Sequence, residues 1–319
     1  MWNQWDAAHY VEIARVGYGP SWWNTAFFPL LPLAIRLFVS TGLDPTVAGM
    51  VIAAVASLVA LVYLHRLAEE EIREGAGWRA CTYLAFFPTA VFLVAPYGEP
   101  LFLAGTISAF YYARRARWRA VGLPAAVAVG SRLTGVAVLF GLLLEGLRQT
   151  LPLRKRLEQL GALAVGAIPL ILYAAFLWRR MGHPLHFVIA LSAWQRRATD
   201  PITTFQVTWQ DMLHSNGSAA WAYAWRGEIL AVLTGAFVLV IFLRRREWGY
   251  AGFMGATLAA YAGSGYYFAT PRMLLTFFPI ALLLAETIRE ERWHNVVLLM
   301  MASVAAVGAV VFTTGLWFF

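Results

Sequence analysis

The feature that most restricts how this chain folds is a series of ten apolar runs separated by short polar turns. Several runs approach the roughly 20 residues that a helix needs to cross a bilayer. Only 13% of the 319 residues are charged, against about 25% in soluble domains. We therefore predict an all-α polytopic membrane protein. The expected spans cover residues 46–66, 79–96, 100–113, 120–131, 133–147, 159–178, 228–243, 249–267, 273–287 and 295–315.

Basic residues set the expected orientation of these runs. Sixteen of the 25 Lys and Arg residues fall on alternate loops, which the positive-inside rule places in the cytoplasm. The net charge of +8 is thereby explained without a nucleic-acid partner, and none is expected. We predict one membrane domain over residues 1–319, with outer loops at 1–45 and 179–227. The other outward segments are residues 96–100, the neighbourhood of Arg132, and residues 269–272.

Some runs are too short to cross a membrane alone. Residues 27–40 begin and end on the outer side and contain two prolines, so we expect a re-entrant or interfacial segment. Residues 120–131 and 133–147 are expected to form two half-depth helices that meet at Arg132. Charged groups at membrane depth usually line pathways or sites. An outward-facing cavity that contains Arg132 is therefore predicted.

The opening stretch WDAAHYVEIARVGY fits a helix that begins near Asp6. Asp6 is either the N-cap of that helix or a general base at the mouth of the outer cavity. His9 lies one turn further on the same face. It either orients Asp6 and contacts substrate, or is a hydrogen-bonding residue at the surface.

Two further charges lie between or within apolar runs. Glu99, in the turn PYGEP, is either solvated or binds a substrate hydroxyl. Arg132 is surrounded by apolar residues and needs an anion. Its partner is either an acid such as Glu99 or Asp6, or a substrate phosphate, which suits the planar geometry of Arg.

The second outer loop and the following outer turn also carry candidate residues. Trp194, Gln195, Arg196 and Arg197 end the segment HFVIALSAWQRR. It is either an amphipathic surface helix or a groove for an anionic lipid head group. Arg272, which follows Pro271, either snorkels to the interface or holds a phosphate in the cavity.

At these residues the chain resembles the PIG-V-like mannosyltransferases, a family of the GT-C glycosyltransferase superfamily. The resemblance is carried by WDAAHYVEIARVGYG and AFFPLLPL, followed in order by PYGEPLF, GSRLTG, the segment at 187–197 and PRMLLTFFPIALLLA. It covers roughly residues 5–290, and its first motif is the most specific. It implies a multi-span GT-C fold and chemistry on the non-cytoplasmic face.

The resemblance also implies substrates and roles. The donor is a polyprenyl- or dolichyl-phosphate-linked mannose, and the acceptor is a lipid, a glycan or a protein. Asp6 is the implied base of an inverting single displacement, and Arg132, with Arg272 or Arg197, stabilises the leaving lipid phosphate. No cofactor is expected, since the sequence shows no nucleotide-binding glycine motif. No metal ligands are assigned, because no DxD pair suggests a metal, and the sequence does not reveal whether one is needed. The other expected substrate contacts are Trp5, His9, Glu99, Trp194 and Gln195.

Other classes of protein stay open at this point. A transporter or flippase of a lipid-linked sugar or organic anion would use the same charges as a translocation path. A non-catalytic membrane subunit would use Asp6 only as a helix cap. GT-C proteins typically place a span before the aspartate loop, so we expect an N-terminal span to be missing from this sequence. The low cysteine content and the abundance of Ala, Arg and Trp favour a bacterial plasma membrane.

Overall fold

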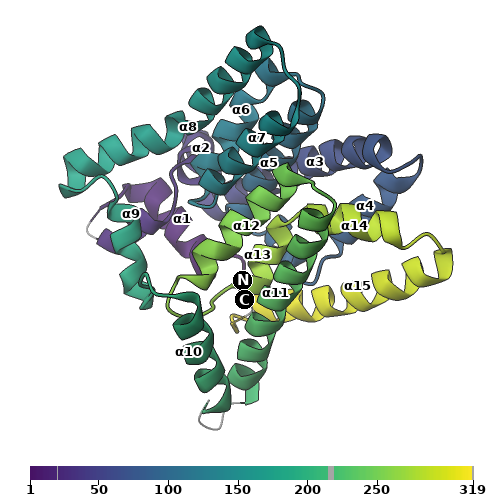
Figure 1. Cartoon of the computed structure of the whole chain (residues 1–319). Coiled ribbons are helices and arrows are strands. Elements are labelled where there is room, and N and C mark those ends of the chain that lie inside the picture. The colour runs from purple at the N-terminus through teal and green to yellow at the C-terminus, as the bar shows by residue number, and fades with distance from the viewer. Residues whose placement is uncertain (20, 215–218, 318–319) are drawn as a thin grey trace.

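A computed structural model describes residues 1–19, 21–214 and 219–317, which form helices joined by turns, with no strand in these ranges (Figure 1). The predicted all-α class is confirmed. The α-helices are α1 (Asp6–Val16), α2 (Leu30–Val39), α3 (Pro45–Glu71), α4 (Ala76–Ala85), α5 (Glu99–Arg114), α6 (Gly122–Ser131), α7 (Gly135–Arg148), α8 (Leu153–Met181), α9 (His186–Ile189), α10 (Pro201–Leu213), α11 (Ala219–Arg244), α12 (Trp248–Ala262), α13 (Thr270–Thr276), α14 (Pro279–Thr287) and α15 (Glu291–Thr313).

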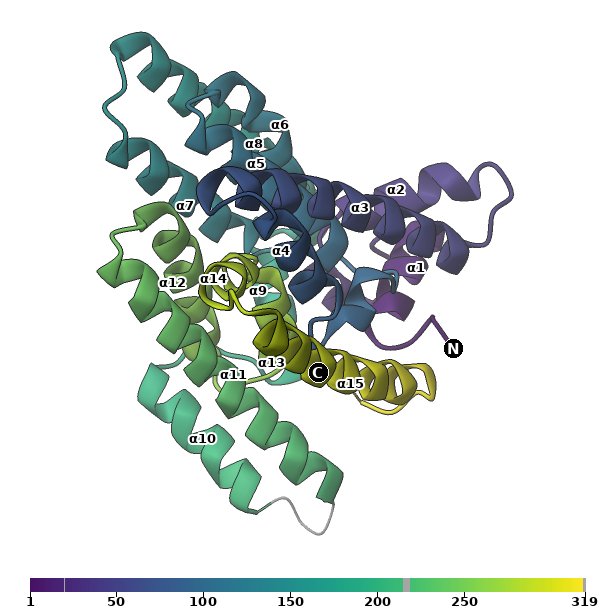
Figure 2. The same ribbon diagram turned by 90° about the vertical axis from the view of Figure 1, so that its right-hand side faces the viewer.

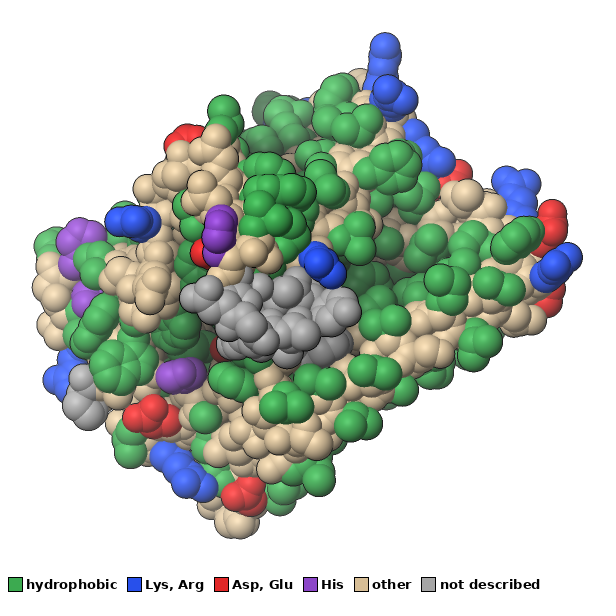
Figure 3. Space-filling view, turned by 90° about the horizontal axis from the view of Figure 1, so that it is seen from below, with side chains coloured by type: hydrophobic (Ala, Val, Ile, Leu, Met, Phe, Trp, Pro, Cys, Tyr) green, Lys and Arg blue, Asp and Glu red, His purple; other side chains and the backbone are tan. Residues whose placement is uncertain are grey.

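Among the described residues, four helices are long and apolar enough to cross a membrane: α3, α8, residues 224–244 of α11, and α15. Their outer sides expose large hydrophobic side chains, for example Leu58, Leu172, Phe237 and Val307. Figure 3 shows hydrophobic side chains spread across one face of the molecule, with charged side chains mainly toward its edges. Apolar surface of this extent is expected to face lipid, so the polytopic membrane class is confirmed.

Two predicted spans are interrupted, and their prediction as continuous helices is wrong. The run at 79–96 is α-helical only to Ala85, with a short 3-10 helix at Ala90–Leu93, because Pro88 disfavours helical backbone at the residue before it. The run at 273–287 is divided into α13 and α14, where Pro279 lacks the N–H that would continue a helix. The predicted break at Arg132 is confirmed, since α6 ends at Ser131 and α7 begins at Gly135.

Helix α5 lies at the centre of the fold and packs against α3, α6 and α7, while α7 packs in turn on α12 (Figures 1 and 2). It is buried on nearly every side, as expected for a helix that is hydrophobic all round. The approach to α6 is close: a Cβ added at Gly105 would lie 2.6 Å from Ala128 N. Small residues at such contacts let two membrane helices pack tightly.

The C-terminal end of α5 lies in a cluster of charged side chains. Arg114 Nε is 3.1 Å from Glu71 Oε1, and its Nη2 is 2.6 Å from Glu247 Oε2. Glu145, which is fully buried, completes this cluster with Arg148. The ends of α3, α5, α7 and α11, which the basic loops predict to share one side, therefore do meet. The other end of α5 begins at Glu99, about 24 Å away for a helix of 16 residues.

The two ends of the described chain also meet. The ring of Trp2 lies 6.1 Å from that of Phe312, and the ring of Trp5 lies 5.0 Å from that of Trp317. Helix α10 runs beside α11, and the pair projects from the body of the fold (Figures 1 and 2). The start of α1 lies close to the start of α5 and to α13, because Arg272 of α13 contacts both Asp6 and Glu99.

Candidate active site

Four charged side chains that are distant in sequence form one continuous chain of ion pairs. Arg272 Nη1 donates to Asp6 Oδ2 at 2.7 Å, and Arg272 Nε lies 3.1 Å from Glu99 Oε1. Glu99 also forms an ion pair with Arg132. We call Asp6, Arg272, Glu99 and Arg132 the ion-pair chain, because each residue contacts the next. Each of them is a residue that the sequence predicted for the site.

The two acids differ in accessibility. The side chain of Asp6 is 26% exposed, whereas that of Glu99 is 2% exposed. The solvated alternative for Glu99 is therefore wrong, because its carboxylate is enclosed between two guanidinium groups. A buried carboxylate that bridges two cations is suited to orient them. The exposed carboxylate is suited to meet a substrate.

The alternative of Asp6 as a helix cap is also wrong. Asp6 is the first residue of α1, the N-cap position is occupied by Trp5, and no side chain caps this helix. Aspartate caps do occur elsewhere: Asp44 Oδ1 accepts from Thr46 N at 2.9 Å, at the start of α3. An acid in the first turn of a helix is still favoured by the helix dipole, and the Asp6 side chain remains partly accessible there.

Arg132 and Arg272 owe their positions to interrupted helices. Arg132 has extended backbone where α6 ends and α7 has yet to begin, so its side chain leaves the apolar helix surface and enters the site. Arg272 lies in the first turn of α13 and is 11% exposed. The snorkelling alternative for Arg272 is wrong, because the side chain turns inward to Asp6 and Glu99.

Glu228 of α11 holds the start of α13 in place and was not singled out by the sequence. Its carboxylate accepts from Ala269 N at 2.8 Å, and from Thr270 N and Thr270 Oγ1 at 2.7 Å each. Ala269 has a φ of 59°, a conformation that costs energy for a non-glycine residue. Glu228 therefore stabilises a strained turn just before Arg272. In the sequence, Glu228 is an acid just before an apolar run. An acid exposed at the surface would give the same pattern, so the pattern does not identify the role of Glu228.

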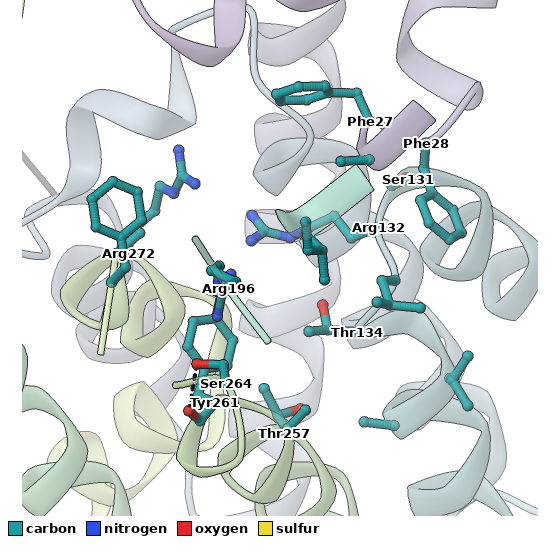
Figure 4. Close-up of a pocket in the computed structure, with 18 of the residues that line it drawn as sticks. Phe27, Phe28, Ser131, Arg132, Thr134, Arg196, Thr257, Tyr261, Ser264 and Arg272 are labelled. Atoms are coloured by element: carbon teal, nitrogen blue, oxygen red, sulfur yellow. Dashed lines mark hydrogen bonds between the residues drawn. The ribbon is translucent and has the colours of Figure 1, made fainter. Parts of the chain in front are cut away.

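All four residues of the ion-pair chain line a cavity of about 790 Å³, which we call the central cavity. Arg132 and Arg196 point toward the same space, with Tyr261 beside Arg196 (Figure 4). The guanidinium carbon of Arg196 lies 5.1 Å from the centre of the Tyr261 ring, in the range of a cation–π contact. The cavity lining therefore includes three arginines and two carboxylates.

One wall of the central cavity is apolar. It is formed by Phe27 and Phe28 before α2 and by Leu133, Val136 and Phe140 at and after the α6–α7 break. Val136 and Phe140 are 42% and 46% exposed, so this wall continues to the outer surface of α7. The cavity thus combines a charged centre with an apolar side that reaches the surface.

The predicted segment at 186–197 is not one helix. It consists of α9 followed by a 3-10 turn at Ala190–Trp194, and Gln195 then adopts a left-handed φ of 57°. Trp194, Gln195, Arg196 and Arg197 all line an adjacent hollow, but only Trp194 and Arg196 also line the central cavity. The sequence prediction names Arg197 as a site residue and omits Arg196, whereas Arg196 is the one that lines the central cavity. No local feature of the sequence distinguishes these two adjacent arginines.

His9 and Trp5 lie outside the lining of the central cavity. His9 Nδ1 is 2.8 Å from Asn24 Oδ1, and Asn24 Nδ2 donates to Glu12 Oε2 at 3.0 Å. The His9 ring also stacks on Phe27, with 4.6 Å between ring centres. These contacts hold η1 (Trp22–Ala26) against α1. A substrate role for His9 and Trp5 stays a prediction.

Metal ligands are not grouped in the part of the chain that the structure describes: no three His, Cys, Asp or Glu side chains there are placed to hold one ion.

The fold and the site together define a polytopic helical membrane protein with a charged cavity between short and broken helices. The family model described as "Mannosyltransferase (PIG-V)" matches residues 1–149. The resemblance read from the motifs is thereby confirmed over that part of the chain. It contains Asp6, Glu99 and Arg132, while Arg272 and Arg196 lie beyond it.

Similar proteins carry a consistent name. The "GPI alpha-1,6-mannosyltransferase 2" of Cricetulus griseus is 36% identical over 154 residues, which cover 42% of this chain and 29% of that protein. The proteins of that name from Rattus norvegicus and Mus musculus are also 36% identical, over 29% and 30% of their lengths. The matched part of this chain thus spans about three-tenths of those relatives. No solved structure matches the chain.

Proposed function

We propose that this chain transfers a mannosyl or related hexosyl residue from a polyprenyl- or dolichyl-phosphate-linked donor to a hydroxyl of a lipid, glycan or protein acceptor. One observation carries the proposal: Asp6, Glu99 and Arg132, all inside the matched segment, converge with Arg272 on one cavity. The name of the relatives supports mannose as the sugar.

The proposed reaction is an inverting single displacement in which Asp6 is the base. The acceptor oxygen forms a bond to the anomeric carbon as its proton passes to the Asp6 carboxylate. The bond between the anomeric carbon and the phosphate oxygen breaks, and the lipid phosphate leaves with that electron pair. Asp6 is suited to this role because it is the more exposed of the two acids.

Negative charge grows on the leaving phosphate during this step. Arg132, Arg196 and Arg272 line the same cavity as the two acids, so its described ionised groups carry one net positive charge. Cations fixed in advance where charge develops usually supply a large part of catalysis. Glu99 keeps two of these arginines oriented, and we assign it a positioning role.

The apolar wall supports a lipid-linked donor. Val136 and Phe140 extend from the phosphate-binding centre to the exposed surface of α7, where a prenyl chain would leave the cavity for the bilayer. We place the reaction on the non-cytoplasmic side, since the site lies at the opposite end of α5 from the cluster around Arg114. No cofactor is required by this scheme.

The test is mannose transfer in membranes that contain the chain, with radiolabelled polyprenyl-phosphate-mannose as donor. Asp6→Asn keeps a hydrogen-bonding group for Arg272 but removes the base, and we expect transfer to fall by at least about 100-fold at unchanged protein level. Asp44→Asn is the matched control, because it makes the same change at a helix cap outside the cavity. Full activity of Asp6→Asn would refute the base assignment. Donor binding without transfer by the unaltered chain would favour a transporter.

A further inference from the structure

A separate space of about 480 Å³ lies between α1, α2, α6 and α8, and we call it the lateral groove. One wall is formed by Pro32 and Leu33 of α2, and the other by Gly130 of α6 and by residues 169–176 of α8. Among the described residues that line it, Arg36 alone is charged. The groove has the size of a typical ligand site, and its lining is almost entirely apolar.

The hydroxyl groups beside the groove are already bonded to the backbone. Tyr18 OH donates to Phe27 O at 2.6 Å, and Tyr173 OH donates to Thr25 O at 2.8 Å. A polar ligand would therefore lose hydrogen bonds on entry, which costs free energy. Apolar cavities stay dry, so an empty groove would leave its lining without contacts on one side. A hydrocarbon chain supplies these dispersion contacts.

The lateral groove lies at the depth of the membrane. Helix α8 is long and apolar enough to cross a bilayer, and residues 169–176 belong to its second half. Leu172 and Phe176 line the groove and are 64% and 43% exposed, and Leu33 on the α2 wall is 56% exposed. The groove is therefore continuous with the surface that faces lipid, and bilayer lipids reach it from the side.

Arg36 marks the polar end of the groove. Its Nε donates to Ala14 O at 2.8 Å and its Nη2 to Ile13 O at 3.0 Å, which ties α2 to the end of α1. Its Nη1 has no hydrogen bond within the described part of the chain, and the residue is exposed. Helix α3 begins shortly afterwards at Pro45 and crosses the membrane, so Arg36 lies near the level of the lipid head groups. A guanidinium group there suits a phosphate.

We propose that the lateral groove binds one acyl chain of a bilayer phospholipid, whose phosphate contacts Arg36. The lipid is a resident ligand and not a substrate. The prenyl chain of the donor is assigned to Val136 and Phe140 of α7, and neither residue lines the groove. Residues 27–28 line the central cavity and residues 29–30 line the groove, so the bound chain supports the wall of the active site. That effect on activity rests on the proposed mannosyl transfer, whereas the binding does not.

The test measures lipid binding to the full chain in nanodiscs, without a donor. The probe is a phosphatidylglycerol with a photoreactive diazirine near the end of one acyl chain, and mass spectrometry locates the cross-links. Leu172→Trp fills the groove, and we expect it to lower labelling of α2 about tenfold. Leu58→Trp is the matched control, because it makes the same change at an exposed α3 side chain outside the groove. Leu33→Trp repeats the test from the other wall if Leu172→Trp does not fold.

Equal labelling of α2 in Leu172→Trp, Leu33→Trp and the Leu58→Trp control would overturn the inference. Displacement of the probe by polyprenyl phosphate would also overturn it, in favour of the donor chain. A diacylglycerol with the same photoreactive chain lacks the phosphate, and we expect it to label α2 about tenfold less. Equal labelling by the two probes would refute the contact with Arg36.

Transfer assays separate this proposal from the proposed function. We expect Leu172→Trp to lower kcat and to leave the donor KM unchanged, since the lipid supports a wall and does not bind the donor. Transfer of mannose to the phospholipid itself would refute its resident role. Labelling that Leu172→Trp abolishes, with no transfer by the unaltered chain, would refute the proposed function but support the lipid site.

Discussion

Removing the negative charge of Glu99 is expected to damage both stability and activity. Glu99→Gln leaves the guanidinium groups of Arg132 and Arg272 beside a neutral amide in a nearly closed site. At 3.1 Å and an effective dielectric of about 20, the Glu99–Arg272 attraction alone is roughly 5 kcal/mol. Desolvation offsets part of it, and breaking one partner of a buried pair typically costs about 3–5 kcal/mol. We expect a loss of stability in that range.

The assay is unfolding of the purified chain by SDS in mixed micelles, followed by far-UV circular dichroism. Glu99→Gln combined with Arg132→Gln serves as the matched control, because it removes one positive and one negative charge together. The stability changes caused by substituting the two partners of one ion pair are not additive. The double variant should therefore be more stable than Glu99→Gln alone. If Glu99→Gln changes stability by less than about 0.5 kcal/mol, as a surface substitution does, the bridging role of Glu99 is refuted.

Three other predictions concern groups around the site. Glu228→Gln should release the turn before α13 and lower transfer at least about tenfold, with activity partly restored by the shorter acid in Glu228→Asp. Arg196→Ala should raise the donor KM about tenfold or more, whereas Arg197→Ala should leave it unchanged; equal effects would contradict the placement of the two side chains. Hydrogen bonds from Thr203 lower the pKa of Asp200 below its usual value. The N-terminus of α10 should therefore keep its protection from hydrogen exchange above about pH 4 and lose it as the pH falls through the folded pKa; equal protection at pH 3 and pH 6 would contradict this.

Local properties of the chain were sufficient to predict the class of protein and several elements. Hydrophobic runs and charge placement identify a helical membrane protein, because transfer of each residue into lipid depends mainly on its own side chain. The start of α1 at Asp6 and the break at Arg132 followed from periodicity and from one charge in an apolar run. The interruption before Pro279 also follows from a local rule, since proline lacks the N–H that would continue a helix.

The partners of the charged residues depended on the fold. Asp6 and Arg272 are separated by 266 positions, and the choice of Glu99 as the partner of Arg132 was one of several left open. Glu228 acquired its role only because α11 passes beside the start of α13. Arg196 and Arg197 are adjacent and chemically identical, yet after the left-handed turn at Gln195 only Arg196 lines the central cavity, while both line the adjacent hollow. Burial energies act residue by residue, whereas ion pairs require two atoms within a few ångströms, and only the packing of distant helices brings such atoms together.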